Sequence, residues 1–145
     1  MKHESIQELF DQAAARFSDQ PAIERGAFSL RYGELADRSN RLANFLIASG
    51  LTVGTTVAIL SEDVVDIVTA IIACLKARCV FVPLDPALSE KTLESIVAEV
   101  RPPLVISEPR FIDRLSGLTS ARVVCLNGDE FEKFSDNNNP GLAIG

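Results

Sequence analysis

Acidic side chains follow two short apolar segments in positions where they could serve phosphoryl or metal chemistry. Glu62 and Asp63 follow Val57 to Leu60 after one serine, and Asp85 follows the next apolar run. Clustered carboxylates can hold a divalent cation, but a phosphoacceptor site also needs a lysine after a late strand. The late run Arg122 to Leu126 is followed by Asn-Gly-Asp instead. We therefore expect Ser-Glu-Asp at 61–63 to cap the helix that comes next, where carboxylates suit the positive end of the dipole.

The other reactive side chains point to core or surface roles. Lys76 ends an apolar segment, where burial can make an amine reactive, but near a helix C-terminus we expect it to reach solvent.

His3 is the only histidine of the chain and lies near its N-terminus. The phosphate-loop patterns G-x-G-x-x-G and G-x-x-x-x-G-K-[ST] and the nucleophile turn G-x-S-x-G are absent. Without zinc-site spacing, three cysteines are expected to be reduced core thiols: Cys74, Cys79 and Cys125. We assign no catalytic, cofactor-binding or metal-binding residue.

Composition is that of a globular domain. The 145 residues are 47% hydrophobic and 23% charged, with a net charge of −6, which is too apolar for a disordered tail. The basic residues are scattered among acids, which disfavours a nucleic-acid-binding face. The longest apolar stretch, Val64 to Leu75, is shorter than the roughly 20 residues that span a bilayer. The first residues lack the order of a signal peptide, so we expect a cytoplasmic protein.

Hydrophobic spacing predicts alternating helices and strands. The expected helices are Ile6 to Phe17, Tyr32 to Ser49, Asp63 to Ala77, Ser89 to Val100 and a short one at Phe111 to Leu115. The expected strands are Ala22 to Arg25 and Phe28 to Arg31, joined as a hairpin through Gly26, then Val57 to Leu60, Cys79 to Val82, Leu104 to Ser107 and Arg122 to Leu126.

Short apolar strands separated by helices build βαβ units, which place helices on both faces of a parallel sheet. We therefore predict an α/β fold: a three-layer sandwich with a mostly parallel sheet, plus a short N-terminal β-hairpin. Residues 1–126 are expected to form this unit. Residues 127–145 are polar and end in an apolar Leu-Ala-Ile-Gly, so we expect a loop and a truncated start of a further strand.

Two segments of the chain read as recognisable motifs: residues 75–86 are LKARCVFVPLDP, and residues 29–35 are SLRYGEL. They resemble L-K-A-G-x-A-Y-V-P-L-D-P and L-[TS]-Y-x-E-L, two motifs of the adenylation domains of nonribosomal peptide synthetases, within the acyl-adenylate-forming superfamily of AMP-dependent synthetases and ligases. Residues 142–144, Leu-Ala-Ile, are similar to the strand that precedes the family's phosphate loop. The chain thus resembles a partial version of the family's N-terminal subdomain.

The resemblance implies a reaction for the complete domain. ATP and Mg²⁺ serve to convert an amino acid into an aminoacyl-adenylate, which then passes to the thiol of a carrier protein. The phosphate loop and later motifs would come after Gly145, so we expect no activity from this chain alone. The implied partners are the remainder of the adenylation domain or adjacent condensation and carrier domains. The alternative is a non-catalytic scaffold or docking module that interacts with neighbouring synthetase domains, and a third class is an unrelated α/β nucleotide binder. Self-association through an exposed sheet edge is a further expected interaction.

Departures from the family motif carry structural expectations. Arg78 replaces a glycine at a helix end where a positive φ is expected, at a cost of about 1 kcal/mol. Pro83 and Pro86 are expected to make an abrupt exit from the strand before them, and Asp85 to bond backbone in the turn.

Overall fold

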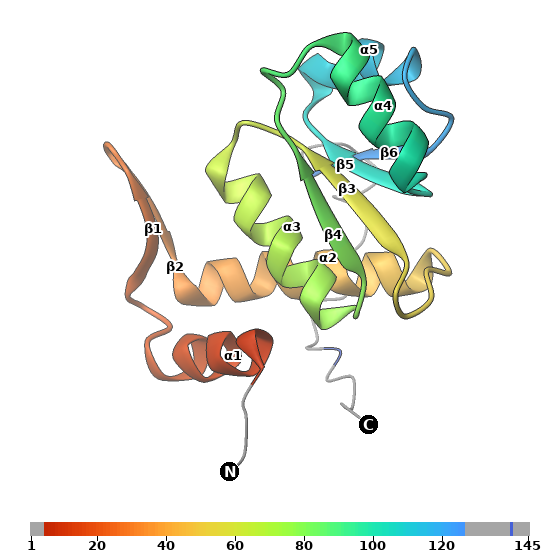
Figure 1. Cartoon of the computed structure of the whole chain (residues 1–145). Coiled ribbons are helices and arrows are strands. Elements are labelled where there is room, and N and C mark those ends of the chain that lie inside the picture. Colours follow the sequence, from red (N-terminus) through yellow and green to blue (C-terminus); the bar gives the residue numbers. More distant parts are fainter. Residues whose placement is uncertain (1–4, 127–139, 141–145) are drawn as a thin grey trace.

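The computed structural model describes residues 5–126 and residue 140. Its centre is a four-stranded parallel sheet in the order β4-β3-β5-β6. The strands are β3 (Thr56–Leu60), β4 (Val80–Leu84), β5 (Leu104–Ser107) and β6 (Arg122–Cys125). Helices α2 (Tyr32–Ala48) and α3 (Val64–Lys76) cover one face, and α4 (Glu90–Val100) and α5 (Ile112–Ser116) cover the other (Figure 1). The predicted three-layer α/β fold is confirmed.

The side chains of β3 point alternately into two separate hydrophobic cores. Val57 and Ile59 pack with α2 and α3, whereas Ala58 and Leu60 pack with α4 and α5. All four are at most 2% exposed. A strand buried on both faces reads as a continuous apolar run, as parallel sheets require.

Local capping sets where the helices begin. Helix α1 (Ile6–Arg16) begins after Ser5, whose Oγ accepts from the N–H of Glu8 at 3.2 Å. Asp63 caps α3 and Ser89 caps α4 in the same way. These side-chain acceptors satisfy donors that the first helical turn leaves unpaired. The capping role expected for residues 61–63 is therefore confirmed for Asp63, whereas Oγ of Ser61 accepts from the N–H of Asp63 and the carboxylate of Glu62 pairs with Arg110.

The N-terminal hairpin consists of β1 (Pro21–Arg25) and β2 (Phe28–Arg31), and it projects from the body beside α1 (Figure 1). Gly26 in the turn has φ +58°, as the tight connection requires. A two-stranded ribbon has only marginal stability by itself. Here a third apolar cluster joins it to the helices through Leu30, Leu35, Val65 and Ile72.

Strand β4 does not end before Pro83, contrary to the expectation from the sequence. Pro83 lies inside the strand, opposite Ile59, and does not end it; the strand continues to Leu84. The N–H of Val80 donates to Thr55 of the neighbouring chain segment, so alternation turns the backbone of Phe81 and Pro83 away from β3. A proline is tolerated there because β4 is an edge strand and the missing donor faces outward.

The expectation that Lys76 reaches solvent is wrong. Its side chain is 2% exposed and does not reach solvent; Nζ lies 2.5 Å from Oδ1 of Asp11 and 5.9 Å from the ring centroid of Phe10. The pair joins α1 to the end of α3. A buried ammonium needs such a partner, because desolvation without one is costly.

The expected division of the chain at residue 126 stays a prediction. Of residues 127–145 the structure describes Pro140 alone, so the loop and the truncated strand lie outside the described residues.

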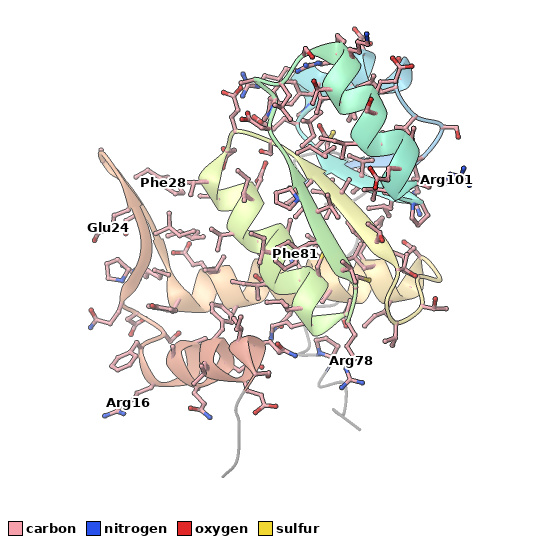
Figure 2. All side chains as sticks on the ribbon, viewed as in Figure 1. Arg16, Glu24, Phe28, Arg78, Phe81 and Arg101 are labelled. Carbon is pink, nitrogen blue, oxygen red and sulfur yellow. The ribbon has the colours of Figure 1, made fainter. Side chains whose placement is uncertain are left out.

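Two arginines adopt the left-handed backbone conformation. Arg78 has φ +59° in the turn from α3 to β4, and Arg101 has φ +49° at the end of α4 (Figure 2). Only glycine populates this region without a steric cost. The positive φ expected at position 78 is confirmed.

We predict that Arg78→Gly raises the free energy of unfolding by up to about 1 kcal/mol, because it relieves the strain of a Cβ at positive φ. Urea denaturation measures the change. Arg78→Ala removes the same side chain but keeps the Cβ, so it should give no gain. Equal stabilisation by both variants would contradict backbone strain as the cause.

Candidate functional site

The strand order defines where a ligand would be sought in such a sheet. The chain passes from β3 to β4 on one side, then crosses back to β5 on the other side of β3. Ligands of open α/β sheets bind where this order reverses, outside the carboxyl ends of the strands. Here that point lies between the end of β3, followed by Ser61, and the end of β5, followed by Glu108.

A hydrogen-bond network around Glu108 bridges this point. Its Oε2 accepts from the N–H of Glu62 at 2.7 Å and from Oγ of Ser61 at 3.1 Å. Arg110 donates to the same oxygen at 3.3 Å and also lies 3.4 Å from the carboxylate of Glu62. A backbone N–H, a hydroxyl and a guanidinium form an anion-binding set, and in this structure the anion is Glu108 itself.

The charge state of Glu108 follows from these contacts. Burial disfavours its ionised form, but the hydrogen bonds from Glu62, Arg110 and Ser61 outweigh burial and lower its pKa. The carboxylate is therefore ionised at neutral pH and holds the ends of β3 and β5 together.

Asp66 adds a buried carboxyl in the first turn of α3. It is 5% exposed, and its Oδ1 lies 3.5 Å from Arg38 on α2. Burial, followed by the negative charge of Asp63, raises the pKa of Asp66 to about 6, although Arg38 acts in the opposite direction and Glu108 adds to the rise.

The loop between β4 and α4 is held by α5, which lies in the same helical layer as α4. The guanidinium of Arg114 on α5 donates to the carbonyl oxygens of Pro86 at 2.6 Å and Leu88 at 2.7 Å, and it pairs with Glu90. Asp85 Oδ1 accepts from the N–H of Ala87 at 2.9 Å. The backbone role expected for Asp85 is confirmed. Of the carboxylates considered at the sequence level, Asp63 caps α3, Asp85 bonds backbone in the turn and Glu62 pairs with Arg110.

The thiols are likewise structural. Cys74 and Cys79 are buried, whereas Cys125 is half-buried, and all three are free. Burial, with a smaller contribution from Cys79, raises the pKa of Cys74 to about 12. A neutral thiol is a poor nucleophile.

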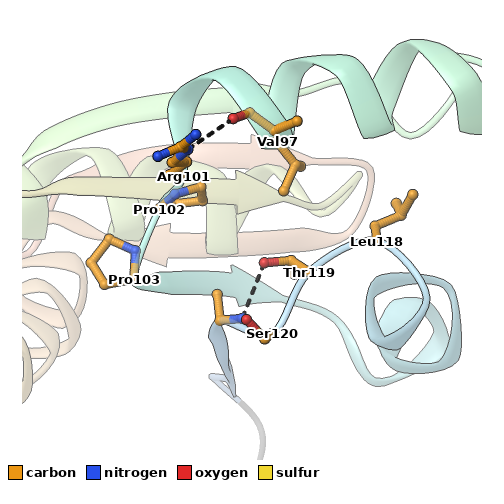
Figure 3. A pocket seen from close by; sticks show the side chains of 9 residues that line it. Val97, Arg101, Pro102, Pro103, Leu118, Thr119 and Ser120 are labelled. Carbon is orange, nitrogen blue, oxygen red and sulfur yellow. Dashed lines mark hydrogen bonds between the residues drawn. The ribbon is translucent and has the colours of Figure 1, made fainter.

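A pocket lies at the opposite end of the sheet, beyond the end of α4 (Figure 3). It encloses about 600 Å³. Its rim includes Arg101, whose N–H donates to Val97, and Thr119, which accepts from the N–H of Ala121. Both hydrogen bonds are local to their own segments, and the residues that line the pocket include no cluster of catalytic side chains.

The described residues do not fit the phosphates of ATP or a Mg²⁺ ion. The donors at the strand-order reversal are engaged by Glu108, and the carboxylates of Glu62, Asp63 and Asp66 would repel a phosphate. Within residues 5–126, no His, Cys, Asp and Glu side chains are grouped as a metal site.

Among the residues that the structure describes, no helix is long and apolar enough to cross a membrane.

Sequence reasoning missed Glu108 and Arg110 as members of the site. Both come after β5, and the rule that carboxyl ends of parallel strands meet at one edge was available as a signal. The strand order that brings β5 beside β3 was not readable from the chain.

The chain matches one protein family over most of its length: residues 10–142 match the AMP-binding enzyme family. A subunit of the linear gramicidin synthase of Brevibacillus parabrevis is 33% identical over 121 residues, which are 83% of this chain and 2% of that protein. Surfactin synthase subunit 1 of Bacillus subtilis is 31% identical over 104 residues, 72% of this chain and 3% of that protein.

Solved structures of related fold agree with this family match. The crystal structure of VinN superposes with a TM-score of 0.87 at 22% identity, covering 100% of this chain and 40% of VinN. The nonribosomal peptide synthetase FmoA3 gives a TM-score of 0.83 at 25% identity, covering 92% of this chain and 14% of that one. The chain belongs to the AMP-binding enzyme family, and it matches the N-terminal portion of adenylation domains of nonribosomal peptide synthetases. It spans a small part of the length of these relatives.

Asp66 gives a pH-dependent prediction. The folded state binds its proton more tightly than the unfolded chain, since the pKa rises from 3.8 to about 6. The contribution of Asp66 to the free energy of unfolding is therefore fully present below about pH 4 and falls by about 3 kcal/mol as the pH rises through about 6. Asp66→Asn should remove this fall and be more stable than the parent chain at neutral pH.

Urea denaturation across pH 4 to 7 measures this difference. Glu94→Gln, on the exposed surface of α4, is the matched control and should retain the parent slope. A parallel loss of stability with pH in the parent and Asp66→Asn chains would show that Asp66 is not responsible.

Proposed function

We propose that this chain forms the N-terminal α/β scaffold of an amino-acid-activating adenylation domain in nonribosomal peptide biosynthesis. The observation that carries the proposal is the family match across residues 10–142, joined to relatives that are peptide synthetases. The complete domain would use ATP and Mg²⁺ to form an aminoacyl-adenylate and then load a carrier protein, in the cytoplasm. An AMPPNP-bound form is known for FmoA3, which supports ATP as the nucleotide.

Within that domain, this portion supplies packing and no catalytic residue. Residues 1–126 serve as the α/β unit, and residues 127–145 connect it to the remainder of the domain. The motif of residues 75–86 supports this role, because its side chains form the end of α3, the edge strand β4 and the loop held by Arg114. Adenylation needs cations and backbone donors around the phosphates, whereas the carboxyl edge described above is acidic.

We predict that the purified 145-residue chain gives no amino-acid-dependent ATP–pyrophosphate exchange above background with any of the twenty amino acids. A complete adenylation domain assayed in parallel controls for reagents, and circular dichroism checks that the chain is folded. Amino-acid-dependent exchange by the chain alone would overturn the scaffold assignment.

A second candidate function is docking to an adjoining synthetase domain, and one observation favours it. In and directly after helix α1, the apolar side chains of Ile6, Leu9 and Phe17 are 68%, 52% and 44% exposed. Ile6 and Leu9 belong to α1 and Phe17 is its C-cap residue, while Phe10 and Ala14 pack inward. A group of exposed apolar side chains is typical of an interaction surface.

For this candidate, we predict that Leu9→Glu weakens binding to an adjoining condensation or carrier domain at least tenfold in titration calorimetry. Gln12→Glu adds the same charge at another exposed position of α1 and should bind as the parent does. Equal affinity of both variants, or no binding by the parent chain, would exclude α1 as the docking surface.

A further inference from the structure

The hydrogen-bond donors around Glu108 have the composition of a binding site for one carboxylate group. Three donors reach its oxygen Oε2: Oγ of Ser61 at 3.1 Å, the N–H of Glu62 at 2.7 Å and the guanidinium of Arg110 at 3.3 Å. They come from the connection after β3 and from the turn after β5, so the fold assembles them at the strand-order reversal. These donors are called the carboxylate cradle below.

The hydroxyl of Ser61 is oriented by a second hydrogen bond. Ser61 is 6% exposed, and its Oγ accepts from the N–H of Asp63 at 3.0 Å. Because this bond occupies one lone pair of the oxygen, the hydroxyl proton is directed to the carboxylate of Glu108. A buried donor of this kind needs an acceptor, since leaving it unpaired costs free energy. The cradle is therefore formed by the turn and waits for an anion.

The charge of the cradle suits a monoanion. Arg110 also lies 3.4 Å from the carboxylate of Glu62, so its positive charge is shared between two carboxylates. Asp63 and Asp66 add negative charge at the start of α3. A dianion such as inorganic phosphate would be repelled there. A free monoanion would replace the charge of Glu108 without changing the total.

We propose that Glu108 is the tethered occupant of a carboxylate-binding site, and that this site binds a free small carboxylate once the tether is removed. Glu108→Ala deletes the γ-methylene and the carboxylate, whose heavy atoms are those of acetate. Acetate can therefore return the acceptor to the same position. The side chain of Glu108 is 17% exposed, which leaves a route from solvent into the vacated space.

The size of the vacated space gives the site selectivity among carboxylates. Propionate has one methylene more than the deleted atoms, and this methylene would meet the β-carbon that remains at position 108. A packed site tolerates such an overlap poorly, so propionate should bind more weakly than acetate. The site follows from hydrogen bonds between described residues and is independent of the proposed adenylation role, so either can fail without the other.

Thermal denaturation of Glu108→Ala in rising acetate, with chloride keeping the ionic strength constant, tests the proposal. We expect the variant to melt below the parent chain in chloride alone. Its midpoint should rise saturably with acetate, by roughly 5 °C at about ten times the dissociation constant, because acetate binds the folded state. Propionate should give a smaller rise, and phosphate should give none beyond its effect on the parent chain.

Two further variants assign the effect to the cradle. Glu108→Gln fills the same space and keeps an oxygen acceptor, so it is the matched control and should respond to acetate no more than the parent chain does. Glu108→Ala combined with Ser61→Ala removes a cradle donor and should lose most of the acetate response. The amide NMR signal of Glu62 should move in Glu108→Ala and return toward its parent position as acetate is added.

Unfolding of Glu108→Ala in chloride would not remove the test. In that case acetate should restore the native circular dichroism saturably, and failure to restore it would count against the site. A folded Glu108→Ala chain without an acetate response, an equal response to phosphate, or the same response in Glu108→Gln would each overturn the proposal.

Discussion

The constraint on which the structure depends is the burial of β3 on both faces and along both edges. Its apolar side chains alternate between two cores, so neither helical layer can be removed without exposing half of the strand. A parallel strand of this kind needs crossover helices on both sides. The passage to β4 through α3 and the return to β5 through α4 supply them, and every other feature of the fold is arranged around that crossing.

The same crossing determines the chemistry of the carboxyl edge. It brings the ends of β3 and β5 together, where related topologies leave a crevice for a ligand. In this chain Glu108 accepts hydrogen bonds from Ser61, Glu62 and Arg110. Of the remaining carboxylates, that of Asp63 caps α3, that of Asp66 pairs with Arg38 on α2 and that of Glu62 pairs with Arg110. The edge is thus a structural junction, which agrees with a scaffold role for this part of an adenylation domain.

The family motif at residues 75–86 consists of residues that hold parts of the fold together. Lys76 ties the end of α3 to α1, Arg78 makes the left-handed turn into β4, and Pro83 closes the outer edge of that strand. The loop after β4 is held by Arg114 from the other helical layer. The motif therefore links three parts of the fold.

The sequence by itself determined the elements, the fold class and the family, because their signals are local. Ser5, Asp63 and Ser89 cap helices through bonds that span two or three residues, and hydrophobic spacing separates strands from helices. Only the tertiary structure decided the contacts of Lys76 with Asp11 and of Glu62 with Glu108, which lie 65 and 46 residues apart. Such pairs, like the edge position of Pro83, depend on strand order, which local hydrogen bonding and periodicity do not encode.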